Sequence, residues 1–126
     1  MGKSKDLFEL AKNDAKVARI LLNLANDELM QNTAAYHIEQ AIEKILKSII
    51  VDNGGQAGIT HSIMELSKDL EEMNIEIPKW VKENDDEITA WATTIRYNAN
   101  FKADHDIIEK VISLTEKWIK ELEQRK

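Results

Sequence analysis

Apolar side chains recur at intervals of three and four residues through most of this chain, and that spacing constrains its fold more than any other feature. The clearest run lies between residues 35 and 49, where one helical face would carry Ala35, Ile38, Ala41, Ile42, Ile45, Leu46 and Ile49. Residues three and four apart lie on the same side of an α-helix. The pattern predicts a helix packed against a core, ending where Asn53, Gly54 and Gly55 permit left-handed backbone angles.

Two further helices are expected before Pro78. Residues 7–29 carry apolar residues mostly at helical intervals, namely Leu7, Ala11, Ala18, Leu21, Leu22 and Ala25. The polar residues 31–33 are expected to separate this helix from the one at 35–49. Another helix of about three turns should follow the cap Thr60 or Ser62, since Ser62 and Glu65 form a capping-box pattern and one face carries Ile63, Leu66 and Leu70.

Two more helices are expected after Pro78, because proline cannot continue a helix from the preceding residues. Asn84 offers a side-chain cap with acids at 85–87, and the stripe that follows consists of Ile88, Trp91, Ala92 and Ile95. Asp104 should cap the last helix, whose stripe consists of Ile108, Val111, Ile112, Thr115, Trp118, Ile119 and Leu122. These helices and their modest connections predict an all-α fold, an antiparallel up-and-down bundle of four to five helices.

Length and composition bound the class of protein. With 126 residues the chain has room for one core, so residues 1–126 are expected to form a single helical domain. It has no cysteine, which excludes disulfides and cysteine chemistry and fits a reducing cytoplasm. No apolar run approaches the roughly 18 residues of a membrane span, and residues 1–5 do not lead into a secretory signal. We therefore expect a cytoplasmic protein without a membrane anchor.

The charge balance limits binding to nucleic acid. The formal net charge is −6 and the sequence pI is about 5.1, so the protein as a whole repels a phosphate backbone. Broad electrostatic binding to nucleic acid is therefore not expected, and a local basic cleft is the remaining option.

The order of several landmarks along the chain resembles a known family. These are Ala11, Asp14 and Ala18 in the first helix, the run 40–47 with Gln40, Glu43-Lys44 and Leu46-Lys47, the stretch Thr60-His61-Ser62 followed by Leu66, and finally Arg96-Tyr97. Each is similar to a landmark of HEPN domains, and together they span essentially the whole chain. The chain is therefore identified as a member of the HEPN family by resemblance.

The resemblance implies a helical bundle that pairs as a homodimer, with the arginine-containing segments of both subunits lining a cleft. Many HEPN proteins are metal-independent ribonucleases whose motif is an arginine, four to six residues, then a histidine. Others are toxins that are silenced when a partner nucleotidyltransferase adds AMP to a tyrosine just past that histidine. For this chain the resemblance implies a nucleotide- or RNA-binding surface formed by Arg96, Tyr97, Asn98, Asn100, Gln40 and Glu43.

The sequence departs from both activity patterns. The positions expected to hold the catalytic histidine are occupied by Phe101, Lys102 and Ala103, and His105 comes after eight intervening residues. A tyrosine acceptor just beyond is absent as well. We therefore predict a binding protein rather than an enzyme, whose ligand is a nucleotide, an RNA or a partner nucleotidyltransferase. The alternatives are a ribonuclease toxin of a toxin–antitoxin pair, with Arg96 and His105 as its catalytic candidates, and a structural scaffold without a ligand.

Each candidate residue also has a structural interpretation. The planar donors of Arg96 suit phosphate oxygens, but the same side chain is equally suited to pair with an acid of the first or second helix. Asp14 falls on or beside an apolar stripe and needs a cation there, so we expect a structural ion pair with Lys44 or Arg96. The ridge of Gln40, Glu43, Lys44 and Lys47 faces either the cleft or water.

Metal and cofactor sites are not predicted. The three histidines, His37, His61 and His105, fall in separate segments without a paired metal spacing. His61 is more simply assigned to the start of the third helix. Trp91 and Trp118 lie on apolar stripes and are expected in the core rather than as platforms for nucleotide bases, whereas Trp80 should be partly exposed.

Overall fold

The computed structural model describes residues 2–56 and 62–125, except for the side chain of Arg96. In these residues the chain forms six helices and no strand, which confirms the all-α prediction. The helices are α1 (Gly2–Leu24), α2 (Glu28–Asp52), α3 (Ile63–Glu72), α4 (Lys79–Glu83), α5 (Asp85–Tyr97) and α6 (His105–Gln124). The expected number of four to five helices is therefore too low for the described part of the chain.

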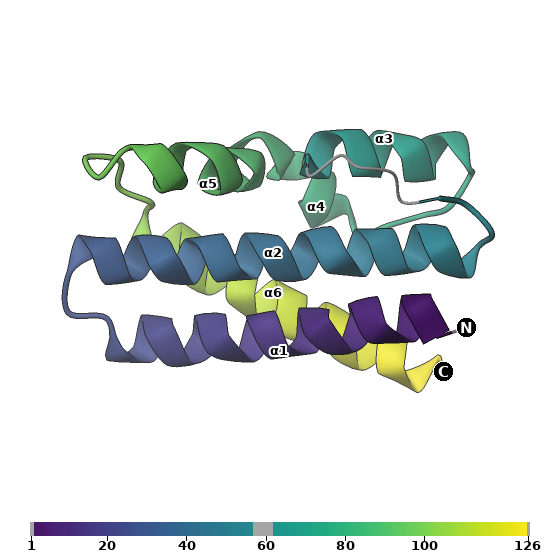
Figure 1. Cartoon of the computed structure of the whole chain (residues 1–126), viewed down its shortest axis with the longest axis horizontal. Coiled ribbons are helices and arrows are strands. Elements are labelled where there is room, and N and C mark those ends of the chain that lie inside the picture. Colours follow the sequence, from purple (N-terminus) through teal and green to yellow (C-terminus); the bar gives the residue numbers. More distant parts are fainter. Residues whose placement is uncertain (1, 57–61, 126) are drawn as a thin grey trace.

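The two longest helices, α1 and α2, form an antiparallel hairpin, and α6 packs against both of them (Figure 1). On the side of α2 opposite α1, helices α3, α4 and α5 follow one another along its length (Figure 1). Helix α2 contacts α1, α3, α5 and α6, so it is the central element of the fold. The start of α1 and the end of α6 lie at the same end of the molecule (Figure 1).

The central position of α2 follows from its apolar stripe. Six residues of the predicted stripe are fully buried, namely Ala35, Ile38, Ala41, Ile42, Ile45 and Leu46. Burying a side chain the size of isoleucine or leucine stabilises a fold by about 1.5–3 kcal/mol. Trp91 of α5 is also fully buried, and Trp118 of α6 is only 4% exposed, so both tryptophans lie in the core as expected. Trp80 is half-buried, with its ring edge-on to Trp118 at 5.8 Å between centroids.

The boundary between the first two helices differs from the sequence prediction. Helix α1 ends at Leu24, and α2 begins at Glu28, so the polar residues 31–33 lie inside α2 rather than between helices. The cause is Asp27, whose carboxylate accepts a hydrogen bond from the Met30 amide at 2.8 Å and caps α2. An aspartate at the N-cap satisfies one of the amides that the first turn leaves without a partner.

The short helix α4 was missed, because five residues are too few to show a helical period. Val81 is its buried residue, and Pro78 precedes its first turn. The predicted role of Asn84 is also wrong: its side chain does not cap α5 but donates to the Trp80 carbonyl at 2.7 Å, at the end of α4. The acids Asp85, Asp86 and Glu87 do occupy the first turn of α5.

Other predicted helix ends are confirmed. Ser62 caps α3 by accepting from the Glu65 amide at 3.3 Å, and Asp104 caps α6 by accepting from the Ile107 amide at 3.1 Å. After α2, Gly54 has a φ of 86°, in the left-handed region that glycine adopts most readily. Thr60, the alternative cap, and His61 lie outside the described residues.

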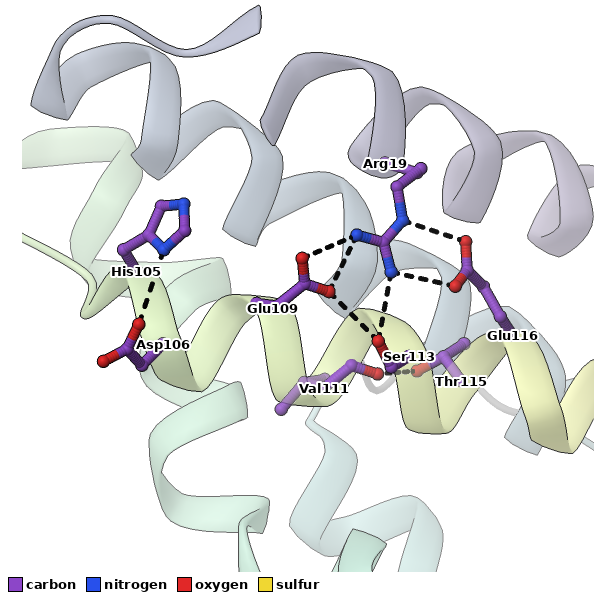
Figure 2. A network of polar contacts seen from close by, with 8 residues as sticks. All are labelled: Arg19, His105, Asp106, Glu109, Val111, Ser113, Thr115 and Glu116. Carbon is purple, nitrogen blue, oxygen red and sulfur yellow. Dashed lines mark hydrogen bonds and ion pairs between the residues drawn. The ribbon is translucent and has the colours of Figure 1, made fainter. Parts of the chain in front are cut away.

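A charged network on the surface joins α1 to α6 (Figure 2). The Arg19 guanidinium donates to Glu109 at 2.7 and 2.8 Å and to Glu116 at 2.9 and 3.2 Å. Ser113 lies between these acids, accepting from Arg19 at 3.1 Å and donating to Glu109 at 3.0 Å. The hydrogen bonds that Arg19 donates to Glu116, and then those to Glu109, raise the pKa of Arg19 although partial burial lowers it, so the cation stays charged and fixes the two helices side by side. Within the described residues, no helix combines the length and the apolar character needed to cross a membrane.

Candidate functional site

The polar segment that the sequence singles out lies at the end of α5 and in the connection to α6, residues 98–104. Tyr97, the last residue of α5, is 85% exposed, and residues 98–100 are exposed as well. The Asn98 side chain accepts from the Asn100 amide at 3.0 Å, so the two residues form a local turn. Tyr97, Asn98 and Asn100 are therefore brought together on one exposed corner of the molecule.

Asn32 holds this connection against α2. Its amide nitrogen donates to the Phe101 carbonyl at 2.6 Å, and its oxygen accepts from the Ala103 amide at 2.9 Å. Asn32 is 3% exposed, so its bond with Ala103 is buried and its bond with Phe101 is partly buried. Two hydrogen bonds from one buried amide fix the backbone of residues 101–103, and with it the path of the chain after Tyr97.

Sequence reasoning missed Asn32, because it treated the polar residues 31–33 as a break between helices. A signal was present, since Asn32 lies three residues before Ala35 and so continues the apolar stripe of α2. A polar residue on an apolar stripe requires a hydrogen-bond partner in the core. Here the partner is the backbone of a distant connection.

His105, the reserve candidate for a catalytic base, is the first residue of α6. Its side chain is 51% exposed, and its Nδ1 lies 3.6 Å from the Asp106 carboxylate (Figure 2). On the same connection Lys102 forms a 3.0 Å ion pair with Glu28, at the start of α2. His105 is therefore accessible at the same end of the molecule as the exposed Asn98–Asn100 turn.

Asp14 lies between α1 and α2 and is contacted by two side chains of α2. Lys44 forms an ion pair with one carboxylate oxygen, and His37 Nδ1 lies 3.4 Å from the other. The Asp14 side chain is 13% exposed and that of Lys44 is 25% exposed. The structure thus brings Asp14 together with the lysine that the sequence proposes as its partner, on the helix hairpin.

The polar residues Gln40, Glu43, Lys44 and Lys47 of α2 differ in burial: Glu43 is buried, and the other three are partly exposed. Glu43 is 3% exposed and accepts from Lys47 at 3.1 Å, while the Gln40 amide donates to Glu39, which is fully buried. Sequence reasoning did not single out Glu39. Gln40 and Glu43 therefore make contacts along α2, and a carboxylate as deeply buried as Glu39 or Glu43 lies in the core rather than on a solvated face.

The comparison with family models decides the class of protein. The model described as the HEPN domain matches residues 4–125, nearly the whole chain. The chain belongs to the HEPN domain family. No curated protein and no solved structure matches it significantly. Membership confirms the resemblance of the sequence landmarks and supports a helical domain of a nucleotide- or RNA-binding family.

Arg96, the arginine landmark of this HEPN domain, lies in the last turn of α5 beside Tyr97. Its side chain lies outside the described part of the structure. The two predictions for it, a cation for phosphate oxygens and a partner for an acid of the first or second helix, therefore stay predictions.

The groups that could hold a metal ion are not assembled in the described part of the HEPN domain. Among those residues no three or more histidine, aspartate or glutamate side chains lie close enough together to share an ion. His37 lies beside Asp14, and His105 is exposed at the start of α6 beside Asp106. His61, the third histidine, lies outside the described residues.

Proposed function

We propose that this HEPN domain is a cytoplasmic homodimer that binds a nucleotide or an RNA segment through the surface around Arg96. The observation that carries the proposal is the position of the arginine landmark in a chain that matches the HEPN model from residue 4 to 125. Arg96 follows the buried part of α5 and directly precedes the exposed Tyr97 and the Asn98–Asn100 turn. A cation, an aromatic ring and two amides are thus neighbours along the chain.

These residue types match the parts of a nucleotide. A guanidinium donates two parallel hydrogen bonds to phosphate oxygens, and this pairing is stronger than a neutral hydrogen bond. An exposed tyrosine ring offers a face on which a base can stack, worth about 1–3 kcal/mol per base. Asn98 and Asn100 supply neutral donors and acceptors for the base or the sugar. The binding surface is small and local, as the overall charge of −6 requires.

The proposal favours binding over catalysis, because the histidine of the ribonuclease motif is replaced. Metal-free RNA cleavage needs one group to remove the 2′-hydroxyl proton and one to protonate the leaving oxygen. At the motif positions this chain has Phe101, Lys102 and Ala103, of which Ala103 is buried and Lys102 pairs with Glu28. His105 is the reason to keep a ribonuclease as the second candidate, since its side chain is 51% exposed at the start of α6, directly after the 98–104 connection.

The protein ligand that the resemblance implies is a partner nucleotidyltransferase. We do not assign Tyr97 as the tyrosine that such a partner modifies, because Tyr97 lies directly after Arg96 rather than beyond a histidine. Support for that partner would be a small nucleotidyltransferase that is encoded next to this protein and co-purifies with it. The Arg96→Ala variant should no longer co-purify with that nucleotidyltransferase.

The binding experiment compares two arginine variants. We would measure the Kd of AMP and ATP by calorimetry and that of a fluorescein-labelled single-stranded RNA by anisotropy. Losing a charge-assisted hydrogen bond worth about 1.5–3 kcal/mol predicts about 10- to 100-fold weaker binding for Arg96→Ala. Arg125→Ala is the matched control, because Arg125 is exposed near the end of the chain, and its Kd should change less than twofold.

The same samples separate the alternatives. Sedimentation of the wild type tests the dimer, which should persist at micromolar concentration. If the wild type cleaves RNA in EDTA and both Arg96→Ala and His105→Ala abolish cleavage, the ribonuclease interpretation replaces the binding one. If neither nucleotide nor RNA binds and Arg96→Ala only lowers the melting temperature, the domain is a scaffold and the proposal is wrong.

A further inference from the structure

A cavity of about 540 Å³ lies at the end of the bundle where the start of α1 meets the ends of α2 and α6. The connection between α3 and α4 closes its fourth side with residues 75–78. Asn32, which holds the 98–104 connection, and Asp52, which lines the cavity, are 20 positions apart on α2. At 1.5 Å per residue these points are about 30 Å apart, so the cavity is separate from the surface around Arg96.

The inner wall of the cavity is apolar. Phe8 and Trp118, 5% and 4% exposed, form its base, and Ile75, Ile77 and Leu122 lie half-buried around them. Pockets for small molecules commonly enclose about 300–1,000 Å³ and are lined mainly by apolar and aromatic side chains. This cavity therefore has the size of a small-molecule site, and its lining combines an apolar base with polar and charged residues.

The rim of the cavity is negatively charged. Asp52, Glu76 and Glu121 line it together with a single cation, Arg125. Asp52 accepts a hydrogen bond from Ser4 at 3.0 Å. Among the residues that the structure describes, none of these three carboxylates forms an ion pair. The rim thus carries more negative than positive charge, and its acids are open to a positively charged ligand.

The arrangement of the acids does not suit a metal ion. Across residues 2–56 and 62–125, no three acidic or histidine side chains converge closely enough to hold one. Separated carboxylates around an apolar base instead fit a ligand with two unlike parts. One part is an apolar body that covers Phe8 and Trp118, and the other is a positive group that stays at the rim in contact with water.

We propose that this cavity binds a small organic amine, with its apolar body against Phe8 and Trp118 and its ammonium group beside Glu76 and Glu121. Four segments of the chain line the cavity, and its volume is about 540 Å³. That size fits a small molecule rather than an extended peptide. The proposal is independent of the function proposed for the surface around Arg96.

The test uses 2-phenylethylamine as the probe on the 126-residue chain. We would follow the Trp118 indole N–H and the amides of residues 75–77 by two-dimensional NMR during titration. The uncharged 2-phenylethanol and the anionic 3-phenylpropanoate serve as matched ligands. We expect the amine to bind at least threefold more tightly than the alcohol, and the anion to bind least tightly.

Variants then test the rim. Exposed charge pairs contribute about 0.2–1 kcal/mol each, so Glu76→Gln with Glu121→Gln should weaken amine binding about two- to thirtyfold and leave the alcohol unchanged. Glu72→Gln, an exposed glutamate on α3 outside the cavity lining, is the control and should bind as the wild type does. Equal binding of the three ligands, or an unchanged Trp118 signal at saturating amine, overturns the proposal. The proposal is also overturned if a Lys-Phe-Lys peptide binds tenfold more tightly than the amine and shifts the NMR signals of residues outside the cavity.

Discussion

The side chain of Asn32, on α2, donates to the Phe101 carbonyl at 2.6 Å across 69 positions of sequence. The same amide accepts from Ala103 at 2.9 Å, so one buried residue fixes both sides of Lys102. This contact places the connection between α5 and α6, and it therefore determines where the exposed Asn98–Asn100 turn lies relative to the core. A residue of the central helix thus shapes the proposed binding surface without belonging to it.

We predict that Asn32→Ala destabilises the protein by about 1–3 kcal/mol, because the Phe101 carbonyl and the Ala103 amide lose a buried partner. Urea unfolding measures the change. Asn23→Ala, an exposed asparagine on α1, is the control and should stay within about 0.5 kcal/mol of the wild type. Amide exchange at Ala103 should also accelerate in Asn32→Ala. Unchanged exchange at that amide would show that the clamp does not hold the connection.

Gly54 provides a test of backbone conformation alone. Its φ is 86°, and a Cβ added there would meet no atom within 4 Å, so a substitution meets no steric obstacle. Gly54→Ala should cost about 1 kcal/mol, because residues with a side chain disfavour left-handed angles. Gly54→Asn should cost less, since asparagine adopts those angles more readily. Both values follow from thermal or urea unfolding, and an alanine variant as stable as the wild type would contradict this account.

The helical period predicted most of this fold. The buried faces of α2 and α6, the caps Ser62 and Asp104 and the turn at Gly54 all follow from local patterns, because each depends on residues a few positions apart. The end of α1 and the short α4 were not predicted, since Asp27 competes as a cap with the polar residues 31–33 and one helical turn has no period. When two neighbouring polar segments are equally suited to bound a helix, the sequence alone does not decide which of them does.

The site was less accessible to sequence reasoning than the fold. An ion pair of Asp14 with Lys44 or Arg96 was predicted because an acid beside an apolar stripe requires a cation, and in the structure Lys44 contacts Asp14. The contacts of Arg19 and Asn32 join residues 69 to 97 positions apart, and only the packing of α6 and the 98–104 connection brings the partners together. Pairings across such distances are set by tertiary structure.

The Arg19 network predicts a specific dependence on pH. Hydrogen bonds from Arg19 lower the pKa of Glu109 below its ordinary value of 4.5. A lowered pKa in the folded state stabilises the fold above the unfolded pKa, and that contribution is lost as the pH falls through the folded value. Glu109→Gln should therefore be less stable than the wild type at pH 7, by about 0.5 kcal/mol because solvent screens the exposed pair. The difference should be smaller at pH 3, below the ordinary pKa of a glutamate, than at pH 7.

Urea unfolding at both pH values measures this difference. Glu72→Gln is the control, as an exposed glutamate on α3, and its stability relative to the wild type should not depend on pH in the same way. A Glu109→Gln variant that keeps its full deficit at pH 3 would mean that packing, rather than charge, is responsible.

The Asp14–Lys44 pair decides between a structural and a functional role for the helix hairpin. Lys44→Met leaves the mostly buried Asp14 carboxylate without its ammonium partner, with only His37 beside it, and should destabilise the protein by about 1–3 kcal/mol. Asp14→Leu combined with Lys44→Met should recover most of that loss, because an apolar pair of similar volume often replaces a buried ion pair without cost. Unfolding of the two single variants and the double variant measures the coupling. If the double variant is as stable as the wild type and binds nucleotide or RNA equally well, the ion pair has a structural role. If the double variant is stable but no longer binds, Asp14 and Lys44 belong to the binding surface and the structural assignment is wrong.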